Sequence, residues 1–418
     1  MLPRTRVSDP ELYQLAVEEL YRQEHNIEMI ASESTAPLEV MELSGSVWTN
    51  KTLEGYPGSR FQAGAEVADK LETMAIERAK AVYGAEHVNI QPYSGATANY
   101  GVYAAILKPG DIVLGMRLDQ GGHLTHGSPA NFLSKVYKFE AYGVNPETEE
   151  IDYEALEKQA RELQPKLIIA GGSSYPRLID YERISKVAKE VGAYFMVDMA
   201  HVSGLVAAGV IPSPVPHADF VTSSTTKTFC GPRSGMIMCK AEYAKMIDKG
   251  VFPGSLGSMH LTTMAAKAWC FKHMASDEFK TLMANVVANA ELLAEELTKY
   301  DFRIVSGTTD NHLLMVDLRP KNITGKVFQN ALDSIGITVN KNQIPFDTAS
   351  PFVTSGVRIG LTSITQRGLG AEEVKVIASI MNDVANAPED EAVLKACKEK
   401  AMQLIEKFPL YPAGSFED

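Results

Sequence analysis

Strands and helices alternate along residues 87–239, and this alternation restricts the possible folds more than any other feature of the sequence. Runs of apolar residues predict strands at 87–92, 111–116, 135–139, 166–170, 194–199, 220–223 and 235–239. Apolar residues at helical spacing predict helices at 96–107, 153–163 and 181–191. The sequence therefore predicts an α/β fold, in which helices cover both faces of a mostly parallel sheet.

The segments on either side of this alternation complete a prediction of three parts. Residues 1–55 are expected to form an N-terminal helix, at about 8–22, and an irregular arm; Ser8 and Glu11 fit a capping box at the start of that helix. Residues 56–280, with a first helix at 67–83, would form the large domain. Residues 281–418 would form a smaller α+β domain. A long helical stretch at 261–300 would precede the strands at 303–306, 313–318 and 357–361 and the helices at 326–334, 371–386 and 390–408.

Composition narrows the class of protein. Apolar residues make up 45% of the 418 residues and charged residues 22%, as in globular domains. The balance of 40 basic against 52 acidic residues argues against nucleic acid as the main partner. No run approaches the roughly 20 apolar residues of a membrane span, and the N-terminus lacks an apolar signal core. The four cysteines are scattered without a metal-type pair, so we expect reduced thiols and a cytoplasmic location.

Lys227 and Asp198 follow two of the predicted strands. Lys227 lies in a run rich in hydroxyl groups before a Gly-Pro turn, and Asp198 ends the strand at 194–199. In isolation such a lysine is more often a solvated surface group, and such an acid is as often a helix cap. Together, a lysine that can form an imine and a carboxylate that keeps a pyridine nitrogen protonated are the minimum set for pyridoxal phosphate (PLP) chemistry. Ligands of open α/β sheets bind at these strand ends.

Three further groups of residues fit the same site. Ser94 and Gly95 open a helix after a strand, where free N–H groups can hold a phosphate, although small residues there mostly serve as caps. The glycine-flanked loop 121–127 carries two histidines; no third ligand is evident, so we predict no metal and place His123 against the cofactor ring. His201 is expected either to contact the phenolic oxygen of the ring or to orient Asp198.

Two charged residues outside this region are candidates for substrate contacts. Arg358 starts a strand of the smaller domain and could bind the α-carboxylate of an amino acid with both arms of its guanidinium, although a surface ion pair is an equal alternative. Glu54 lies in the turn-rich loop 53–60, and a rigid loop that holds an acid is suited to proton transfer.

From about residue 10 to the C-terminus the chain resembles the serine hydroxymethyltransferase family. The resemblance rests on the segments Met29–Ser34, Glu54–Gly58, Gly121–Gly127, Val197–His201, Gly231–Arg233, Thr309–His312, Thr338–Asn342 and Ser350–Gly356. It implies a fold-type I PLP enzyme that uses tetrahydrofolate and works as a homodimer, with sites at the subunit interface. The sequence leaves open whether dimers pair into tetramers.

The resemblance also implies roles for single residues. Lys227 would hold the cofactor through an imine, Asp198 would pair with the ring nitrogen and His123 would stack on the ring. The remaining implied contacts are Ser173 and His201 with the phenolic oxygen, Ser94 and Gly95 with the phosphate, Gly257 from the partner subunit with the same phosphate, Arg358 and Ser32 with the substrate carboxylate, Glu54 of the partner with protons at the hydroxymethyl group, and Asn342 with the pterin of the folate.

Four departures from the family pattern lie near these positions. The family usually has tyrosine at position 52, where this chain has Thr52, and paired tyrosines at Phe61 and Gln62. It has histidine directly before the lysine, here Thr226, and a second hydroxyl residue in the phosphate loop, here Ala96. The smaller Thr52 would leave room beside the Cα atom of a substrate.

These features predict a hydroxymethyltransferase of one-carbon and amino-acid metabolism. It would cleave the Cα–Cβ bond of serine, or of an α-substituted serine such as α-methylserine, and pass the one-carbon unit reversibly to tetrahydrofolate. The first alternative is a folate-independent aldolase or transaldolase acting on threonine-like β-hydroxy amino acids, since phenolic groups are missing. The second is an inactive PLP-binding paralogue. The sequence does not distinguish the substituent at Cα.

Overall fold

The computed structural model describes residues 2–416 and divides them into two compact units. The larger unit comprises residues 34–284 and 310–312. The smaller unit comprises residues up to 33, residues 285–309 and residues from 313 onward. The three-part division predicted above, at residues 55 and 280, stays a prediction.

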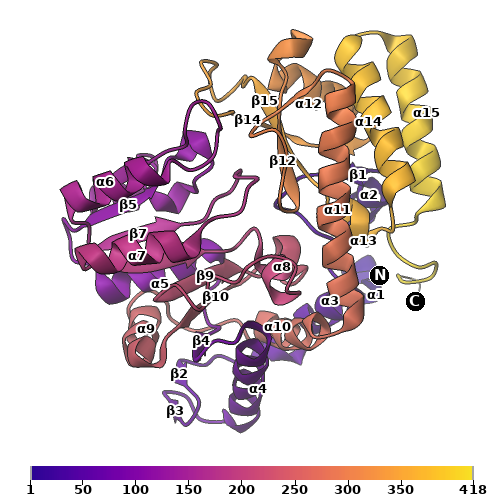
Figure 1. Cartoon of the computed structure of the whole chain (residues 1–418). Helices are drawn as coiled ribbons and strands as arrows, with labels where there is room; N and C mark the ends of the chain where they lie inside the picture. The colour runs from indigo at the N-terminus through magenta and orange to yellow at the C-terminus, as the bar shows by residue number, and fades with distance from the viewer. Residues whose placement is uncertain (1, 417–418) are drawn as a thin grey trace. The chain divides into compact units, whose positions relative to one another are not determined.

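The larger unit is built on a seven-stranded sheet (Figure 1). Four neighbouring pairs of strands in it are parallel, and only β10 is antiparallel to its neighbours, β9 and β4. This arrangement confirms the predicted α/β fold with a mostly parallel sheet. In spatial order the strands are β4 (His87–Asn89), β10 (Gly235–Cys239), β9 (Phe220–Ser224), β8 (Tyr194–Asp198), β7 (Leu167–Ala170), β5 (Ile112–Met116) and β6 (Lys138–Tyr142).

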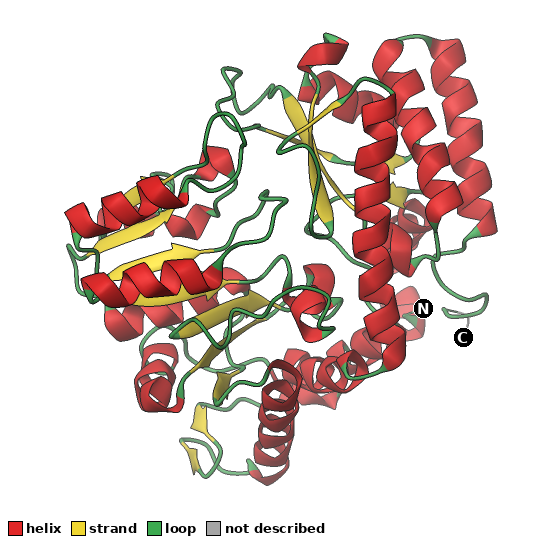
Figure 2. Cartoon of the chain, viewed as in Figure 1, coloured by secondary structure: helices red, strands yellow, loops and turns green. Residues whose placement is uncertain are grey.

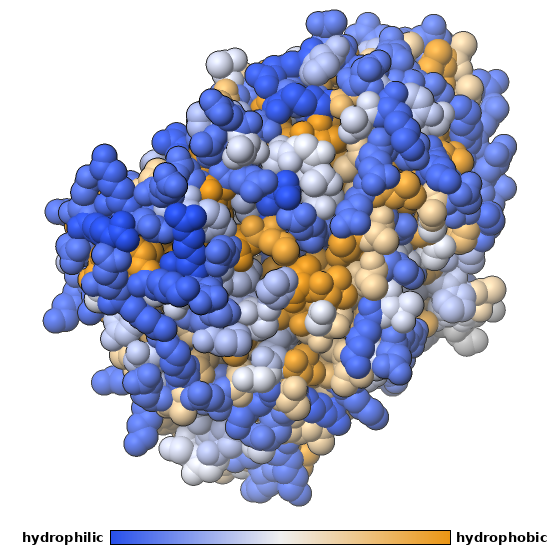
Figure 3. Space-filling model, in the orientation of Figure 1, coloured by the Kyte–Doolittle hydropathy of each residue, from blue (hydrophilic) through white to orange (hydrophobic). Residues whose placement is uncertain are grey.

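Helices cover both faces of this sheet because successive side chains of each buried strand point to opposite sides. On one face, α5 (Gly95–Ile106) and α9 (Ala244–Val251) share a hydrophobic core with alternate strand residues such as Leu167 and Ile169. On the other face lie α6 (Tyr153–Leu163) and α7 (Tyr181–Val191), drawn in front of the sheet (Figures 1 and 2). Their outer surfaces are charged and appear blue in Figure 3, as expected for amphipathic helices.

The rest of the larger unit lies toward the β4 edge of the sheet, the edge opposite to β6. A short hairpin precedes the main sheet, and a glycine turn of positive φ at Gly58 closes it, after Pro57. Helices α4 and α10 pack against each other. The elements of this part are α3 (Leu38–Ser44), β2 (Gly55–Tyr56), β3 (Ser59–Arg60), α4 (Glu66–Tyr83), α8 (Ser203–Ala207) and α10 (Leu261–Met274).

The smaller unit has an antiparallel four-stranded sheet in the order β11 (Arg303–Ile304), β12 (Leu313–Asp317), β15 (Gly356–Gly360) and β14 (Asn340–Asn342). Its hydrophobic core lies between this sheet and the helices of the C-terminal part. The N-terminal arm joins this unit through β1 (Ile27–Glu28), which pairs in parallel with β13 (Ile337–Thr338). The helices are α1 (Pro3–Ser8), α2 (Pro10–Glu24), α12 (Gly325–Ser334), α13 (Thr362–Gln366), α14 (Ala371–Asn386) and α15 (Glu391–Lys407).

Three local predictions are wrong, each because of a polar cap. The first long helix is capped by Asp9, whose carboxylate accepts the N–H of Leu12, while Ser8 ends the preceding helix α1. The helical stretch at 261–300 is two helices, α10 and α11 (Asp277–Lys299), because the hydroxyl of Ser276 accepts the N–H of Phe279 and starts a new helix.

The third correction concerns the strand predicted at 135–139. Residues 132–135 form a 3-10 turn, whose start is capped by the side chain of Asn131, and the strand β6 begins only at Lys138. Among residues 2–416, no helix has the length and apolar character needed to cross a bilayer.

Candidate active site

A cavity of about 230 Å³ lies in the larger unit, where β8 and β9 end and α5 begins. The first turn of α5, the loop 121–127 and the segment after β9 all contribute side chains to its wall. The cavity brings together seven of the residues predicted for cofactor binding: Ser94, Gly95, His123, Ser173, Asp198, His201 and Lys227. They meet there because the carboxyl ends of neighbouring parallel strands lie at one edge of the sheet.

Asp198 is a carboxylate of this cavity whose negative charge is stabilised by several hydrogen bonds. It is buried, and its Oδ2 atom accepts hydrogen bonds from His126 Nε2 at 3.0 Å and from Asn99 Nδ2 at 2.8 Å. Its Oδ1 atom accepts the backbone N–H of Ala200 at 3.0 Å. Burial alone would raise the pKa of Asp198, but the hydrogen bond and charge of His126 outweigh it and hold this pKa well below its usual value. The carboxylate therefore stays ionised.

His126 is held in one tautomer. Its Nδ1 atom accepts the backbone N–H of His123 at 3.4 Å, so its proton lies on Nε2, which faces Asp198. In this tautomer the Nε2–H group of the ring points at the carboxylate of Asp198.

His123 is fixed by a chain of buried hydrogen bonds. Its Nδ1 atom receives both the N–H and the hydroxyl of Thr125. Asn99 donates to Thr125 Oγ1 at 2.8 Å and accepts from Thr222 at 2.6 Å. Burial, together with the charge of His126, lowers the pKa of His123 to about 4, so the ring is neutral at physiological pH. A neutral, immobile imidazole suits stacking on an aromatic cofactor.

Lys227 stands three residues after the end of β9 in the left-handed region, with a φ of +53°, and Cys230 repeats this conformation at +59°. For residues with a Cβ atom this backbone is strained. The following residue, Thr228, holds the segment in place, since its hydroxyl donates to the carbonyl of His201 and accepts the N–H of Gly204. The strained turn aims a lysine into the cavity from a rigid support.

His201 and Ser173 lie on two further loops of the wall. His201 Nδ1 lies 3.3 Å from His312 Nε2, and both side chains are buried. Ser173 donates its N–H to the carbonyl of Gly121 at 2.7 Å, which ties its loop to the loop of His123. Gly121 has a φ of +118°, so this close approach requires glycine.

The first turn of α5 forms a cradle for an anion. Ser94 caps the helix and uses its hydroxyl for the N–H of Thr97, which leaves the N–H groups of Gly95 and Ala96 without intrahelical acceptors. A Cβ atom at Gly95 would lie 3.3 Å from Ser224, whose buried Oγ has no hydrogen-bond partner among residues 2–416. An unsatisfied buried hydroxyl beside two free N–H groups at a helix N-terminus fits a phosphate.

The comparison with protein families agrees with this geometry. The family model described as serine hydroxymethyltransferase matches residues 5–381, which are 377 of the 418 residues. The chain belongs to the serine hydroxymethyltransferase family. Enzymes of this family have fold type I, depend on PLP and pass the hydroxymethyl group of serine to tetrahydrofolate. The protein is accordingly a PLP-dependent hydroxymethyltransferase, and the cavity residues fit the cofactor of its family.

Glu54 and Gly257, two other residues implied by the family, lie outside this cavity but close to each other. A Cβ atom at Gly257 would be 3.6 Å from Glu54 Oε1, and neither residue lines the wall around Lys227. Thr52, two residues before Glu54, is exposed and also lies outside the wall. Glu54 itself is held by Gln62, as described below.

Arg358, Ser32 and Asn342 belong to the smaller unit. Arg358 donates from Nε to Asn340 Oδ1 at 3.1 Å, and burial lowers its pKa to about 10, so the guanidinium remains charged at neutral pH. Ser32 follows the chain segment that packs on β15, where the N–H of Gly360 donates to the carbonyl of Met29. Asn342 ends β14 and donates to the carbonyl of Gln343.

Two histidines and an aspartate of the cavity lie close enough together to be considered as metal ligands. His123, His126 and Asp198 place ligand atoms within 4.8 Å of one another, so a third potential ligand exists that the sequence did not indicate. One nitrogen of each ring already forms a hydrogen bond within this cluster. His126 Nε2 donates to Asp198, and His123 Nδ1 accepts from Thr125. This hydrogen bonding favours a counter-ion for a cationic ring over a metal centre.

Sequence reasoning missed Asn99 and Ser224 as members of the site. Asn99 is fully buried inside the otherwise apolar helix α5, and a lone amide at such a position is the signal that could have found it. Ser224 stands among four other hydroxyl residues between Thr222 and Thr226, which hid its particular position.

Proposed function

We propose that the protein transfers a hydroxymethyl group reversibly between tetrahydrofolate and serine or an α-substituted serine, with α-methylserine as the favoured substrate. The observation that carries the finer part is Thr226, which lines the cavity beside Lys227. The family usually has histidine here, and a threonine leaves more room next to the reacting carbon. Thr52 lies outside the cavity wall of its own chain, two residues before Glu54. A threonine in place of tyrosine there would leave room in the site of a second subunit, which it would reach together with Glu54.

Each residue of the site has a part in this proposal. PLP, when bound, supplies the electron sink for cleavage of the Cα–Cβ bond. Lys227 would hold the cofactor, and Asp198, kept ionised by His126, would keep the ring nitrogen protonated. His123 would lie against the ring and exclude water. Ser173 and His201 orient the ring, and the α5 N-terminus with Ser224 binds the phosphate.

The substrate would be held by the remaining candidates. Arg358 and Ser32 bind the α-carboxylate, for which a half-buried arginine is suited because a carboxylate relieves the cost of its partial burial. Glu54 takes or gives the proton of the hydroxymethyl group, and Asn342 contacts the pterin of the folate. The partners are thus a small amino acid and a folate.

We also propose that Glu54 and Gly257 serve the site of a second subunit in a homodimer, whether or not dimers pair into tetramers. Their closeness to each other, away from the cavity of their own chain, supports this arrangement. In a mixed dimer of the inactive variants Lys227→Ala and Glu54→Ala, one of the two sites has both an intact Lys227 and an intact Glu54. Mixing the two variants is therefore expected to restore activity. Mixtures that stay inactive while subunit exchange is verified would refute the shared site.

The substrate is tested by steady-state kinetics with serine, α-methylserine and threonine, each with and without tetrahydrofolate. We expect folate-dependent transfer from α-methylserine at a kcat/KM above that for serine. The variant Thr226→His should lower this preference by about 10-fold or more, since recognition of one methyl group is worth about 1–3 kcal/mol. Thr281→His, on the exposed face of α11, is the matched control. Acetaldehyde release from threonine without folate, and no transfer from either serine, would favour the aldolase.

A further inference from the structure

Glu54 is positioned by a hairpin that brings residues 61 and 62 opposite to it. In this hairpin Gly55 pairs with Arg60, and the N–H of Phe61 donates to the carbonyl of Glu54 at 3.2 Å. Gly55 has a φ of +88°, and a Cβ atom there would collide with the carbonyl of Ser59. The register therefore fixes the main chain of Glu54 against residues 61 and 62.

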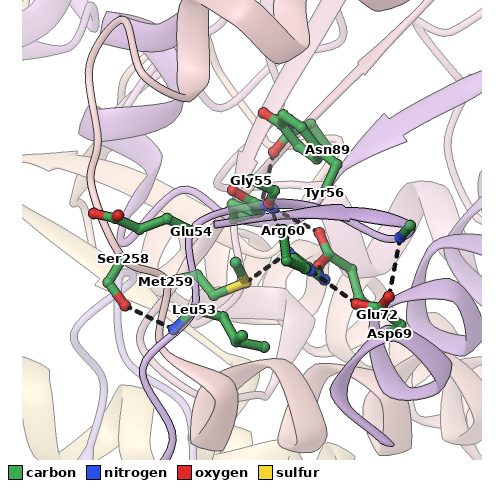
Figure 4. A network of polar contacts seen from close by, with 12 residues as sticks. Leu53, Glu54, Gly55, Tyr56, Arg60, Asp69, Glu72, Asn89, Ser258 and Met259 are labelled. Carbon is green, nitrogen blue, oxygen red and sulfur yellow. Dashed lines mark hydrogen bonds and ion pairs between the residues drawn. The ribbon is translucent and has the colours of Figure 1, made fainter. Parts of the chain in front are cut away.

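The base of the hairpin is anchored by the buried side chain of Arg60, which forms two ion pairs on the side away from the Glu54 carboxylate. Arg60 donates to the carbonyl of Gly55 and forms ion pairs with Glu72 and with Asp69. Gln91 donates to the same carbonyl at 2.9 Å. Figure 4 shows Arg60 between Gly55 and the two acids, and shows the side chain of Glu54 directed away from Arg60. The anchor thus fixes the loop, but it does not touch the reacting carboxylate.

Gln62 does touch it, through two hydrogen bonds that close a ring. The N–H of Glu54 donates to Gln62 Oε1 at 2.7 Å, and Gln62 Nε2 donates to Glu54 Oε2 at 3.1 Å. The first bond settles the orientation of the amide, because a flipped amide would set its NH₂ group against the N–H of Glu54. The second bond then has to be a donation from nitrogen to the carboxylate.

This donor distinguishes the two oxygens of the carboxylate. A proton on Oε2 would face the NH₂ group of Gln62, whereas Oε1 lies on the side of Gly257, 3.6 Å from where a Cβ atom on that glycine would be. We propose that Gln62 is a positioning residue that assigns the exchangeable proton of Glu54 to Oε1. The proposal rests on the function proposed above and deepens it, because it names the atom through which Glu54 acts.

A double-mutant cycle with the holoenzyme and its preferred serine substrate tests the inference. Gln62→Met has a similar volume without donor or acceptor, and we expect it to lower kcat on the order of 10–100-fold, because misplacing a catalytic group by about 1 Å costs that much. The KM values for amino acid and folate should change by less than about 3-fold. In a Glu54→Gln background the same substitution should have no further effect on the residual activity.

Two outcomes would overturn the inference. One is an unchanged kcat in Gln62→Met, and the other is a loss that adds in full to that of Glu54→Gln, which would mean that Gln62 acts independently of Glu54. A wild-type protein that transfers nothing from serine or α-methylserine refutes the proposed function and the inference with it, and this is seen before any variant is made. Gln23→Met is the matched control, since Gln23 donates to Glu19 at 2.8 Å on an exposed helix and should leave kcat unchanged.

A second variant keeps the shape of the side chain and gives an independent readout. Gln62→Glu sets two carboxylates face to face, and such pairs share one proton as the pH falls. Tyr93, whose phenol donates to the carbonyl of Ser258, is a titratable neighbour, since burial and then the charge of Glu54 raise its pKa. We expect the ratio of variant to wild-type kcat to rise at least about 3-fold between pH 8 and pH 6. A flat ratio, with unchanged thermal unfolding, would show a merely structural role and contradict the inference.

Discussion

His126 and Asp198 face each other across 3.0 Å, from the Nε2 atom of the ring to the Oδ2 atom of the carboxylate. The backbone N–H of His123 fixes the tautomer of His126, so the orientation of one histidine depends on the loop that carries the other. Asp198, the proposed counter-ion of the cofactor, and His123, proposed to lie against its ring, are therefore parts of one hydrogen-bonded assembly.

Asn99 connects this assembly to the sheet. In Asn99→Leu, the hydroxyl of Thr222 loses its acceptor, and Thr125 and Asp198 each lose a donor. Since each buried polar group left unpaired costs about 1–3 kcal/mol, we expect the free energy of unfolding of the apo-protein to fall by about 2–4 kcal/mol. Urea unfolding measures it, and Asn386→Leu on an exposed helix end is the control. Equal stabilities of the two variants would contradict the network.

His123 should make stability depend on pH in the acid range. Burial lowers its pKa to about 4, below the ordinary value of 6.5, so the unfolded chain binds more protons between these values. The contribution of His123 to stability is therefore complete above pH 6.5 and is lost as the pH falls toward 4. In His123→Gln this part of the pH dependence, on the order of 2–3 kcal/mol, should disappear from chemical unfolding curves of the apo-protein.

Gly235 should be indispensable for phosphate binding. A Cβ atom there would lie 2.2 Å from the carbonyl oxygen of Ser94, so Gly235→Ala has to displace the start of α5. We expect the dissociation constant of PLP to rise by at least about 10-fold, because the two free N–H groups move with that turn. Fluorescence titration measures it. Gly45→Ala, whose added carbon would meet only ordinary contacts, should bind PLP like the wild type.

Lys267 gives a second, alkaline dependence of stability on pH. Its ammonium group is buried and donates to the carbonyls of Ile90 and Gly235, and burial lowers its pKa to about 7 from a usual 10.5. Between these two pH values the unfolded chain binds more protons than the folded chain. The free energy of unfolding should therefore rise as the pH increases from about 7 to about 10.5. Lys267→Met should remove a slope worth a few kcal/mol. A slope that persists in the variant would assign it to other groups.

The parts of the fold that the sequence predicted best are those specified by local periodicity. The helices at 153–163, 181–191 and 371–386 and the strand at 235–239 match the predicted bounds to the residue. The break between α10 and α11 escaped prediction, because the apolar periodicity continues across it and only the hydroxyl of Ser276 interrupts the helix. Where a boundary depends on one hydrogen bond, periodicity carries no information about it.

The residues of the candidate site likewise fall into those that the sequence predicted and those that only the structure revealed. Lys227, Asp198 and His123 were predictable because their positions follow strand ends, and topology alone brings strand ends together. Asn99 and Gln62 were not, since their importance lies in what their side chains touch across the fold. Ser224 was not, since its importance lies in a buried hydroxyl that lacks a partner among the described residues. For Gln62 the sequence revealed only a departure from the family pattern, and its contact with Glu54 required coordinates.

The larger unit also has a consequence for how the chain is made. His312 lies beside His201, and its neighbours tie it to that unit: Asp310 pairs with Arg177 and Asn311 donates to the carbonyl of Tyr175. All three come from a segment that follows β11 in the sequence, long after the last strand of the main sheet. During synthesis the wall residue His201 lacks its neighbour His312 until that segment has left the ribosome. Cofactor capture should therefore be a late event, and a nascent chain ending before residue 310 should not retain PLP.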